Sequence, residues 1–459
     1  MPERLFGTDG VRGKAGAPPL DVQTIRRLGA ALVRAFGRGS PPLRLLLGRD
    51  TRESGAWIER ELAHGARAEG AAVTSAGIIT TPAVAFLTRH EGFDAGVVIS
   101  ASHNPFEDNG IKVFSGAGEK FTERLERQVE AIVADTSWAV PPGNAVDVGV
   151  RDLAGPYLDH ARRALPSAAR LGAVRIAVDC ANGATTHLAP RLLRALGLDV
   201  TALGCAPDGR NINLACGSTH PGMVADMVRA DGYRLGVAFD GDGDRAIFVD
   251  HLGRVVDGDA VMLLCAKHLK AAGRLRGNAV VATVMSNIGL EIALRRLGID
   301  LVRCPVGDKY VMEELIARDL ALGGEQSGHI IFPDYLFTGD GLVTTLCVLE
   351  TMAATGKELS ELAADLITYP QVLVNVRVAR RVDLGGIPAV AAVMARVGDR
   401  LGREGRLLVR YSGTEPLLRI MLEGRDQAEI NGLAQEIANE VRAHLSAGDG
   451  DQRPVTSGR

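Results

Sequence analysis

Residues 97–105 read VVISASHNP, and the rest of the chain is organised around the serine at their centre, Ser102. The run 97–99 is apolar and β-branched, which is typical of a buried strand. The small and polar residues after it end in Asn-Pro, a turn signal. At the end of such a strand, where open α/β sheets bind ligands, we expect Ser102 to be held firmly and open to solvent. His103 is a candidate proton carrier or hydrogen-bond donor, although a Ser-His pair alone is also common in structural loops.

The composition predicts an ordinary soluble globular protein. A chain of 459 residues is too long for one core and should form three or four domains. A net charge of −3 and 4% aromatic residues give no reason to expect a nucleic-acid or membrane partner. No uncharged apolar run reaches the roughly 18 to 20 residues that span a bilayer, and the first residues lack a signal-peptide core. Six scattered cysteines without CxxC spacing predict free thiols, no zinc site and a cytoplasmic location.

Three successive segments, 1–150, 151–253 and 254–367, repeat one order of elements: strand, glycine-rich loop, helix. Strands are expected over 44–47, 72–74, 97–99 and 279–285 and within RIAVDCANGA and LGVAFDGDGDR, and helices over 57–69, 123–134, 157–164, 188–196, 261–269, 291–297 and 310–318. The repetition predicts three similar α/β domains with mixed sheets.

The pattern changes in the segment 368–446. VLVNVRV alternates like a half-exposed strand, RLLVRYSGTEPLLRIMLEG is typical of a hairpin, and helices are expected over 387–397 and 428–445. These features predict a smaller α+β domain. The tail 447–459 lacks apolar residues and is expected to be disordered.

The acidic loop DGDGDR places Asp240, Asp242 and Asp244 at alternate positions, followed by Arg245. Closely spaced carboxylates suit Mg²⁺, Mn²⁺ or Ca²⁺, and they repel one another unless a cation balances them. An EF-hand is excluded, because it needs glycine at the position of Arg245 and glutamate at that of His251. A phosphoryl group on Ser102 would complete such a metal site. The alternative is a solvated acidic turn.

Two further loops carry polar groups in useful combinations. GEQSGH offers Glu325, Ser327 and His329, which could read sugar hydroxyls or an amine, although such a loop is equally common as a simple turn. RYSGTEP is typical of an anion cradle, the alternative being a surface hairpin with stray arginines. Its candidate phosphate contacts are Arg410, Ser412, Gly413, Thr414 and the nearby Arg419. Lys112, ten residues after Ser102, could transfer a proton or balance charge, and Arg12 is framed by glycines in GTDGVRG.

In this order and spacing, ISASHNP, DGDGDR, GEQSGH and RYSGTEP resemble the α-D-phosphohexomutase superfamily across nearly the whole chain. FGTDGVRG, and Gln326 within GEQSGH, resemble the members that act on glucosamine phosphates. Members that act on glucose or mannose phosphates commonly carry a different residue in place of Gln326. The joint match is far more specific than any single motif.

The resemblance implies four domains around a central active-site cleft, a phosphorylated Ser102, and one Mg²⁺ held by Asp240, Asp242, Asp244 and the Ser102 phosphate. It implies that Arg12, Lys112, Arg245 and Lys309 line the reacting end and that His103 contacts the substrate. Lys112 and His329 are candidates for the general acid and base, and His329 is also a candidate to face the sugar. Glu325 and Ser327 would face the sugar, and Arg410, Ser412, Gly413, Thr414 and Arg419 would hold the non-reacting phosphate.

The activity that the resemblance implies is interconversion of glucosamine 6-phosphate and glucosamine 1-phosphate. It would run through a bound 1,6-bisphosphate, with a sugar 1,6-bisphosphate as activator, and would feed amino-sugar nucleotide and cell-wall precursor synthesis. A homodimer is among the expectations. The alternatives are the same chemistry on glucose or mannose phosphates, a metal phosphatase, and a non-catalytic sugar-phosphate-binding protein.

Overall fold

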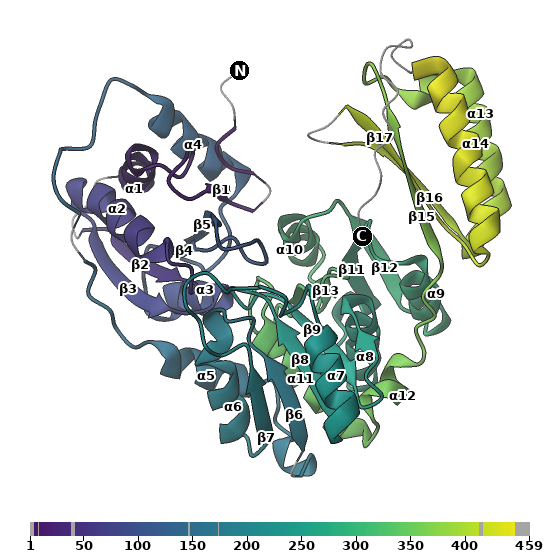
Figure 1. The fold of residues 1–459 in the computed structure, drawn as a ribbon, viewed down its shortest axis with the longest axis horizontal. Helices are drawn as coiled ribbons and strands as arrows, with labels where there is room; N and C mark the ends of the chain where they lie inside the picture. Colours follow the sequence, from purple (N-terminus) through teal and green to yellow (C-terminus); the bar gives the residue numbers. More distant parts are fainter. Residues whose placement is uncertain are drawn as a thin grey trace. The chain divides into compact units, whose positions relative to one another are not determined.

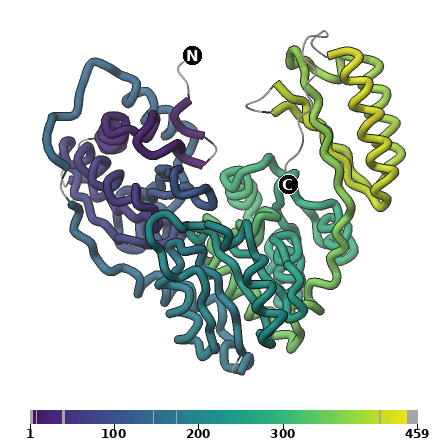
Figure 2. The backbone as a smooth tube through the Cα atoms, in the orientation of Figure 1, coloured from purple at the N-terminus to yellow at the C-terminus, as the bar shows by residue number. Residues whose placement is uncertain are grey.

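The computed structural model describes residues 4–7, 9–37, 42–145, 147–172, 174–412 and 416–445. The chain forms two compact units, one of residues 1–286 with 297–365 and one of residues 287–296 with the chain from 366 onward. The backbone tube in Figure 2 shows the course of the chain through them. In the described part of the chain, no helix combines the length and the apolar character that crossing a membrane requires.

The first domain holds a five-stranded sheet in the order β1-β5-β4-β2-β3. β2 pairs in parallel with β3 and β4, whereas β5 pairs antiparallel with β4 and β1. The strands are β1 (Val11–Lys14), β2 (Arg44–Arg49), β3 (Ala72–Ile78), β4 (Ala95–Ile99) and β5 (Asp108–Ser115), and the helices are α1 (Val22–Phe36), α2 (Gly55–Ala68), α3 (Thr81–His90) and α4 (Glu123–Ala134).

Helices cover both faces of this sheet. On one face, Val97 and Ile99 of β4 pack in one apolar cluster with residues of α1, α2 and α4. On the other face, α3 approaches so closely that a β-carbon at Gly96 would meet the side chains of Val84 and Thr88. Glycine at this position of the central strand is therefore required by the close approach of α3.

The second and third domains contain mixed sheets in the orders β10-β9-β8-β6-β7 and β12-β11-β13-β14. Their strands are β6 (Arg175–Asp179), β7 (Asp199–Leu203), β8 (Leu235–Phe239), β9 (Ala246–Asp250), β10 (Val255–Val256), β11 (Ala279–Thr283), β12 (Asp300–Cys304), β13 (Gly323–Gly324) and β14 (Ile330–Ile331). Their helices are α5 (Ala154–Arg162), α6 (Ala189–Ala195), α7 (Gly222–Asp231), α8 (Gly258–Ala271), α9 (Ile288–Arg296), α10 (Asp308–Ala317), α11 (Gly341–Thr355) and α12 (Leu359–Ala363).

All three sheets share one strand order, which confirms the prediction of three similar α/β domains with mixed sheets. If each domain's four main strands are numbered along the chain, their order across the sheet is fourth, third, first, second. The third and fourth strands always form an antiparallel hairpin. The loops that join them, between β4 and β5, β8 and β9, and β13 and β14, contain Ser102, the three aspartates and Glu325. The three motifs therefore occupy the same place in three copies of one architecture.

The second unit contains an antiparallel sheet in the order β15-β17-β16, with helices α13 and α14 over one face (Figure 1). Its elements are β15 (Gln371–Arg377), α13 (Pro388–Leu401), β16 (Arg406–Tyr411), β17 (Leu417–Glu423) and α14 (Gln427–Leu445). Helix α9 belongs to this unit although it precedes β12 in the chain. Ile288 and Ile292 of α9 pack against Tyr369.

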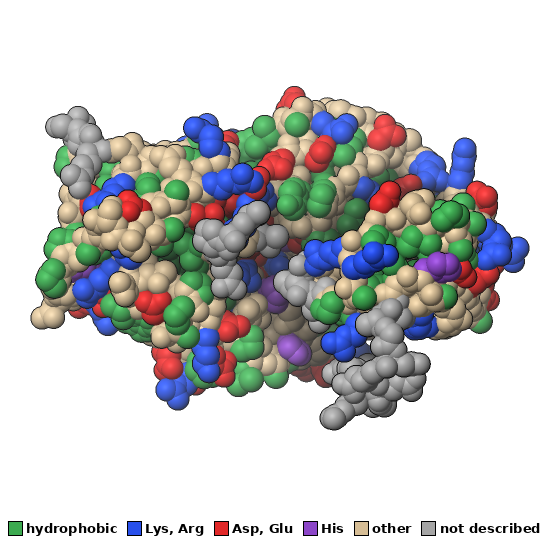
Figure 3. Space-filling view, turned by 90° about the horizontal axis from the view of Figure 1, so that it is seen from above, with side chains coloured by type: hydrophobic (Ala, Val, Ile, Leu, Met, Phe, Trp, Pro, Cys, Tyr) green, Lys and Arg blue, Asp and Glu red, His purple; other side chains and the backbone are tan. Residues whose placement is uncertain are grey.

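Charged side chains of both signs are interspersed on the face seen in Figure 3, with hydrophobic side chains scattered among them. All six cysteines are free thiols, and four of them are buried, which confirms the prediction made from their spacing. The predicted disordered tail, 447–459, lies outside the described residues.

Candidate active site

Ser102 lies in the loop between β4 and β5, but it is buried rather than open to solvent. Its exposed fraction is 1%, because the aspartate loop of the second domain packs against it. The expectation of an open serine was therefore wrong. Its φ of 54° lies in the left-handed region, which costs a residue with a β-carbon about 1 to 3 kcal/mol. Such strain persists where the surroundings hold it, as they do at many functional sites.

The Ser102 hydroxyl contacts the aspartate loop directly. Its Oγ donates a hydrogen bond of 2.5 Å to Asp240 Oδ2, across 138 residues of sequence. His103 Nδ1 lies 3.3 Å from Ser102 Oγ. Burial, together with the cations Arg245 and Arg12, lowers the pKa of His103 to about 4. The His103 ring is therefore neutral at pH 7 and can accept a hydrogen bond.

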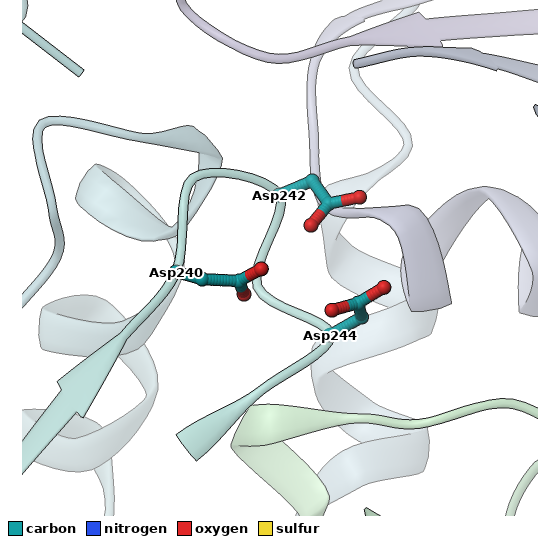
Figure 4. Close-up of side chains that lie close together, drawn as sticks. All are labelled: Asp240, Asp242 and Asp244. Atoms are coloured by element: carbon teal, nitrogen blue, oxygen red, sulfur yellow. The ribbon is translucent and has the colours of Figure 1, made fainter. Parts of the chain in front are cut away.

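Asp240, Asp242 and Asp244 converge in the turn between β8 and β9 (Figure 4). One carboxylate oxygen of each lies within 4.8 Å of the others, and all three residues are buried. Among the described residues, Asp242 Oδ1 and Asp244 Oδ1 are buried without a hydrogen-bond partner. A divalent cation would satisfy both oxygens, and an all-oxygen donor set is the one that Mg²⁺ prefers.

The charges around the loop also fit a cation. Burial, followed by the nearby Asp244 and Asp242, raises the pKa of Asp240 well above its usual range. Burial acts the same way on Asp244, but Lys112 and His329 outweigh it and hold the pKa of Asp244 well below that range. A proton is thus favoured on Asp240, whose nearest charges are the carboxylates of Asp244 and Asp242, while Asp244, beside Lys112 and His329, stays charged.

Lys112 extends from β5 into this acidic cluster. Its Nζ lies 2.9 Å from Asp242 Oδ2, 3.2 Å from Asp244 Oδ2 and 3.1 Å from Asp9 Oδ2. Burial opposes the charge, but these carboxylates outweigh it and hold the pKa of Lys112 well above its usual range. Of the two roles proposed for Lys112, charge balance fits this geometry better than proton transfer.

His329 faces the same cluster from the third domain. Its Nδ1 lies 3.6 Å from Asp244 Oδ1, and its Nε2 lies 3.5 Å from Asp308 Oδ2. Burial opposes protonation, but Asp244 and Asp308 outweigh it and raise the pKa of His329. The amide of Gly339, however, donates a 3.0 Å hydrogen bond to Nε2. Because Nε2 accepts this hydrogen bond, it carries no proton, and the ring proton lies on Nδ1.

A cavity of about 450 Å³ opens beside these groups within the first unit. It is lined by Arg4, Leu5, Gly7, Asp9, Gly10, Arg12, His103, Asp244, Arg245, Val306, Gly307, Asp308, Glu325 and His329. The lining thus includes five of the residues that the sequence predicted for substrate binding or catalysis: Arg12, His103, Arg245, Glu325 and His329. Burial opposes the charge of Arg245, but Asp244 and Asp240 outweigh it and raise its pKa, so it stays charged.

The loop between β13 and β14 presents Glu325 to this cavity. The amide of Gly307 donates to Glu325 Oε1 at 3.2 Å, and the Ser327 hydroxyl donates to Oε2 at 3.3 Å. Ser327 therefore supports Glu325 and is not among the residues lining the cavity. Gln326 donates to Asp257 Oδ2 at 3.0 Å and anchors the loop on the first turn of α8.

Lys309 lies apart from this cavity. Its Nζ pairs with Glu126 at 3.3 Å, and it lines a separate cavity of about 20 Å³. The lysine that instead reaches the groups around the main cavity is Lys120, which pairs with Asp9 at 2.6 Å and also with Asp308. Sequence reasoning missed Lys120, because nothing in its local sequence shows that the first and third domains meet there.

The predicted phosphate contacts lie in the second unit. Arg410 of β16 stands directly opposite Arg419 of β17, so their side chains emerge on the same face of the sheet. Two like charges placed this way repel unless an anion lies near them, which suits a phosphate. Ser412 is buried, and its carbonyl accepts a 2.5 Å hydrogen bond from Arg381. Gly413 and Thr414 lie outside the described residues.

Asp50 and Arg52 were not singled out from the sequence, although they also lie beside Ser102. Both follow β2, which pairs in parallel with β4. Because carboxyl ends of neighbouring parallel strands share one sheet edge, residues after β2 lie beside Ser102. A charged pair directly after a buried strand was the sequence feature that could have identified Asp50 and Arg52.

Four family models match successive parts of the chain. They describe the phosphoglucomutase/phosphomannomutase α/β/α domains I, II and III, at residues 3–139, 155–253 and 257–369, and the C-terminal domain of the same proteins at residues 373–440. A phosphoglucosamine mutase from Solibacter usitatus is 49% identical over 97% of this chain and 100% of its own length. Another, from Syntrophotalea carbinolica, is 47% identical over 97% of this chain and 98% of its own.

Solved structures match the fold over nearly the same length. A phosphoglucomutase/phosphomannomutase family protein from Burkholderia thailandensis matches with a TM-score of 0.78 at 24% identity, over 96% of this chain and 98% of that one. A putative phosphomannomutase from Thermus thermophilus matches with a TM-score of 0.76 at 25% identity, over 96% of this chain and 100% of that one. The strand order, the placement of the three loops and these matches together show that the chain belongs to the phosphoglucomutase/phosphomannomutase family.

Proposed function

We propose that this protein is a phosphoglucosamine mutase, an isomerase that interconverts glucosamine 6-phosphate and glucosamine 1-phosphate. The observation that carries this proposal is the hydrogen bond from Ser102 Oγ to Asp240 Oδ2, which joins a nucleophile to a carboxylate cluster at the edge of a cavity. Relatives at 49% and 47% identity over 97% of the chain are phosphoglucosamine mutases, and their name gives the sugar.

The chemistry is two phosphoryl transfers in opposite directions. The free hydroxyl of the sugar phosphate attacks the phosphorus of phosphorylated Ser102, the bond from phosphorus to Ser102 Oγ breaks, and the hydroxyl proton passes to that oxygen. The product is a bound 1,6-bisphosphate with a free Ser102. After the bisphosphate reverses its orientation, Ser102 Oγ attacks the phosphorus of its other phosphate and the bond from that phosphorus to the sugar oxygen breaks. The serine proton passes to the sugar oxygen, and the isomeric monophosphate leaves. A sugar 1,6-bisphosphate would charge an unphosphorylated enzyme.

Asp240, Asp242, Asp244 and the phosphoryl oxygens on Ser102 would hold one Mg²⁺. Asp242 Oδ1 and Asp244 Oδ1, which are buried and accept no hydrogen bond from the part of the chain that the structure describes, support this assignment. When bound, the ion supplies positive charge to a transferring phosphoryl group, which is the main requirement of such transfers.

The residues proposed for substrate binding and catalysis divide into three tasks. Arg12 and Arg245 would attract the phosphates, and Glu325 would accept a hydrogen bond from the sugar or its amine. His329 remains a candidate acid through its proton on Nδ1, but its Nε2 already accepts from the Gly339 amide, so it is not placed to take the substrate's proton. Arg410, Ser412, Gly413, Thr414 and Arg419 would hold the phosphate that does not react, and the opposed pair Arg410 and Arg419 supports that role. Because the substrate must bind in two orientations, adaptable arginines suit this task.

The remaining expectations stay predictions. They are a cytoplasmic location, Lys309 and Ser327 as direct substrate contacts, a possible homodimer, and the absence of nucleic-acid and membrane partners. The product would enter reactions that attach a nucleotide to an amino sugar.

The test is an isomerase assay with glucosamine 6-phosphate, Mg²⁺ and a catalytic amount of glucosamine 1,6-bisphosphate. We expect glucosamine 1-phosphate to form, with a higher kcat/KM than for glucose 6-phosphate or mannose 6-phosphate assayed in parallel. A higher kcat/KM for either other sugar would reassign the substrate. Release of inorganic phosphate without isomerisation would indicate a phosphatase, and tight binding without turnover after deliberate phosphorylation would indicate a binding protein.

A further inference from the structure

Buried side chains that take no part in the proposed chemistry hold both backbone polar groups of Ser102. Its N–H donates to Ser100 Oγ at 2.9 Å. Its carbonyl oxygen accepts from Arg52 Nη2 at 3.0 Å and from Asn213 Nδ2 at 2.9 Å. Rotation of the Ser102 backbone out of its left-handed conformation would break these buried bonds, each of which is costly to leave unmade.

Arg52 is the centre of this arrangement. Its Nη2 also donates to the Asn104 carbonyl at 2.8 Å, and its Nη1 donates to the carbonyls of Asp108, at 3.0 Å, and Pro105. Its Nε donates to Asp50 Oδ2 at 2.9 Å. All five N–H groups of the guanidinium therefore have acceptors. Three of those acceptors are carbonyls of the loop that carries Ser102 and a fourth is the carbonyl of Asp108, the first residue of β5, so the loop wraps around one planar cation.

Asp50 connects Arg52, which holds the Ser102 carbonyl, with Ser100, which holds the Ser102 N–H. The same Oδ2 that accepts from Arg52 also accepts a 2.6 Å hydrogen bond from Ser100 Oγ, the atom that accepts the Ser102 N–H. The side chains of Arg52 and Asp50 are both 0% exposed. A buried ion pair is often no more stabilising than apolar side chains of the same size. Stability of the fold alone therefore gives little reason for a charged pair at this place.

We propose that Arg52, Asp50 and Ser100 position the nucleophile. They fix the left-handed backbone of Ser102 so that its Oγ faces the aspartate loop, whether or not that oxygen carries a phosphoryl group. The inference rests on the proposed function, because it takes Ser102 as the residue that is phosphorylated. None of the three lines the cavity, so they act through Ser102 and are positioning residues.

The fork shape of the guanidinium is what the proposal requires. Lysine carries the same charge but has three donors on one nitrogen, which cannot reach four carbonyls and a carboxylate in one plane. A small misplacement of a reacting atom can lower a rate by about 100-fold. We therefore expect Arg52→Lys to slow phosphoryl transfer onto Ser102 by about 100-fold. Because the cavity residues are untouched, KM for the sugar bisphosphate should stay near its wild-type value.

The experiment follows phosphoryl uptake by intact mass. Full-length, dephosphorylated protein is mixed with glucosamine 1,6-bisphosphate and Mg²⁺, and the rate and its KM are measured for Arg52→Lys and Ser100→Ala. The matched control is Arg49→Lys at the end of β2, three residues before Arg52, whose side chain pairs with Glu59 at 3.7 Å. Thermal midpoints of all variants are recorded, because a purely structural role would lower the midpoint and leave the rate per folded chain and KM unchanged.

We expect Arg52→Lys and Ser100→Ala to take up the phosphoryl group slowly at an unchanged KM. The control Arg49→Lys should take it up at the wild-type rate. Wild-type uptake rates in the folded variants would overturn the inference. If Arg52→Lys fails to fold, Ser100→Ala, which removes one buried hydroxyl, decides alone. A wild-type protein that isomerises the sugar without taking up a phosphoryl group would overturn the proposed mechanism, and this inference with it.

Discussion

Ser102 combines an unfavourable backbone conformation with a side chain that contacts Asp240. With a φ of 54°, the position would suit glycine better than any residue with a β-carbon. The serine hydroxyl nevertheless donates its 2.5 Å hydrogen bond to the aspartate loop. The position therefore sacrifices some stability for a reactive oxygen, a pattern expected of a catalytic group.

Two substitutions of Ser102 separate its chemistry from its conformation. Ser102→Ala and Ser102→Gly both remove the hydroxyl, so both should lose nearly all mutase turnover. They should differ in stability, because alanine keeps the left-handed strain and glycine relieves it, by about 1 kcal/mol in favour of Ser102→Gly. Urea unfolding of the two variants measures the difference. Equal stability, or a more stable alanine variant, would contradict the conformation described for Ser102.

At the scale of elements, α3 connects the first domain to the aspartate loop. The Thr81 hydroxyl, in the first turn of α3, donates a 2.5 Å hydrogen bond to Asp242 Oδ2, and the Thr81 amide donates to the Asp242 carbonyl at 2.9 Å. The N-terminal end of a helix also favours a negative charge nearby. Helix α3 therefore orients one of the proposed metal ligands.

This contact predicts the effect of Thr81→Val, which keeps the shape and removes the hydroxyl. Outer hydrogen bonds of this kind are worth about 10-fold or more in metal affinity. We expect the Mg²⁺ concentration for half-maximal activity to rise by about 10-fold, with a matching loss in calorimetric Mg²⁺ binding. Thr81→Ser, which keeps the hydroxyl, is the control and should behave like the wild type. Unchanged Mg²⁺ binding in Thr81→Val would place the metal elsewhere.

Asp340, at the start of α11, predicts a pH effect on stability. It accepts from the Val343 amide at 3.0 Å and from the Tyr157 hydroxyl at 3.0 Å. Burial raises the pKa of Asp340 to about 6, above the value of about 3.9 for an unfolded chain. The folded protein therefore holds this proton more tightly. The stability that it contributes is present below about pH 4 and is lost as the pH rises to about 6.

Asp340→Asn cannot titrate and keeps an oxygen for the helix cap. Relative to the wild type, its unfolding free energy should therefore increase by about 2 kcal/mol between pH 4 and pH 7. Chemical unfolding of both proteins across this range gives the difference, in which the other titrating groups cancel. A difference that does not change with pH would mean that Asp340 titrates normally.

The sequence predicted elements well where the periodicity was local. The predicted helix over 123–134 is confirmed as α4 (Glu123–Ala134), whose apolar positions repeat at helical spacing. Helix α1 (Val22–Phe36) was overlooked although Asp21 caps it and its apolar face was visible in the sequence. The strands β13 and β14 have two residues each, too few to show any alternation. Only the pairing of β13 with β11 and of β14 with β13 reveals them.

The sequence predicted the motifs of the proposed site but not the side chains that hold those motifs in place. The serine and the aspartates were recognisable, because closely spaced carboxylates and a serine after a buried strand are local patterns. Thr81 and Asp242 are 161 residues apart, and Arg52 and Ser102 are 50 apart. The first contact comes from the packing of two domains and the second from the pairing of β2 with β4, and a local pattern encodes neither.

At the scale of the whole molecule, repetition of one sheet plan explains how the site is assembled. The antiparallel hairpins of the three sheets each carry one motif loop. The second unit breaks this regularity by including α9, which lies between two strands of the third sheet in the chain. Glu423 joins the two parts of that unit: its Oε2 accepts from the Ile288 amide at 3.1 Å and from Arg406 at 2.9 Å.

This buried contact predicts how the second unit responds to substitution. Glu423→Ala leaves Arg406 without a buried partner, which costs about 3 kcal/mol or more. Amide hydrogen exchange should therefore accelerate together in β17 and in α9, although these are far apart in the sequence. Glu404→Ala, which removes the partner of Arg425 in an exposed pair, is the control and should change little. Acceleration in β17 alone would mean that α9 is not part of this unit.

The central claim is that Ser102 carries the phosphoryl group in transit. Its most direct test is peptide mapping by mass spectrometry of the full-length protein after brief exposure to glucosamine 1,6-bisphosphate and Mg²⁺. The structure predicts one phosphoryl group per chain, on Ser102, which is lost again when glucosamine 6-phosphate is added. Isomerase activity with the phosphoryl group on another residue, or with none on the protein, would contradict it.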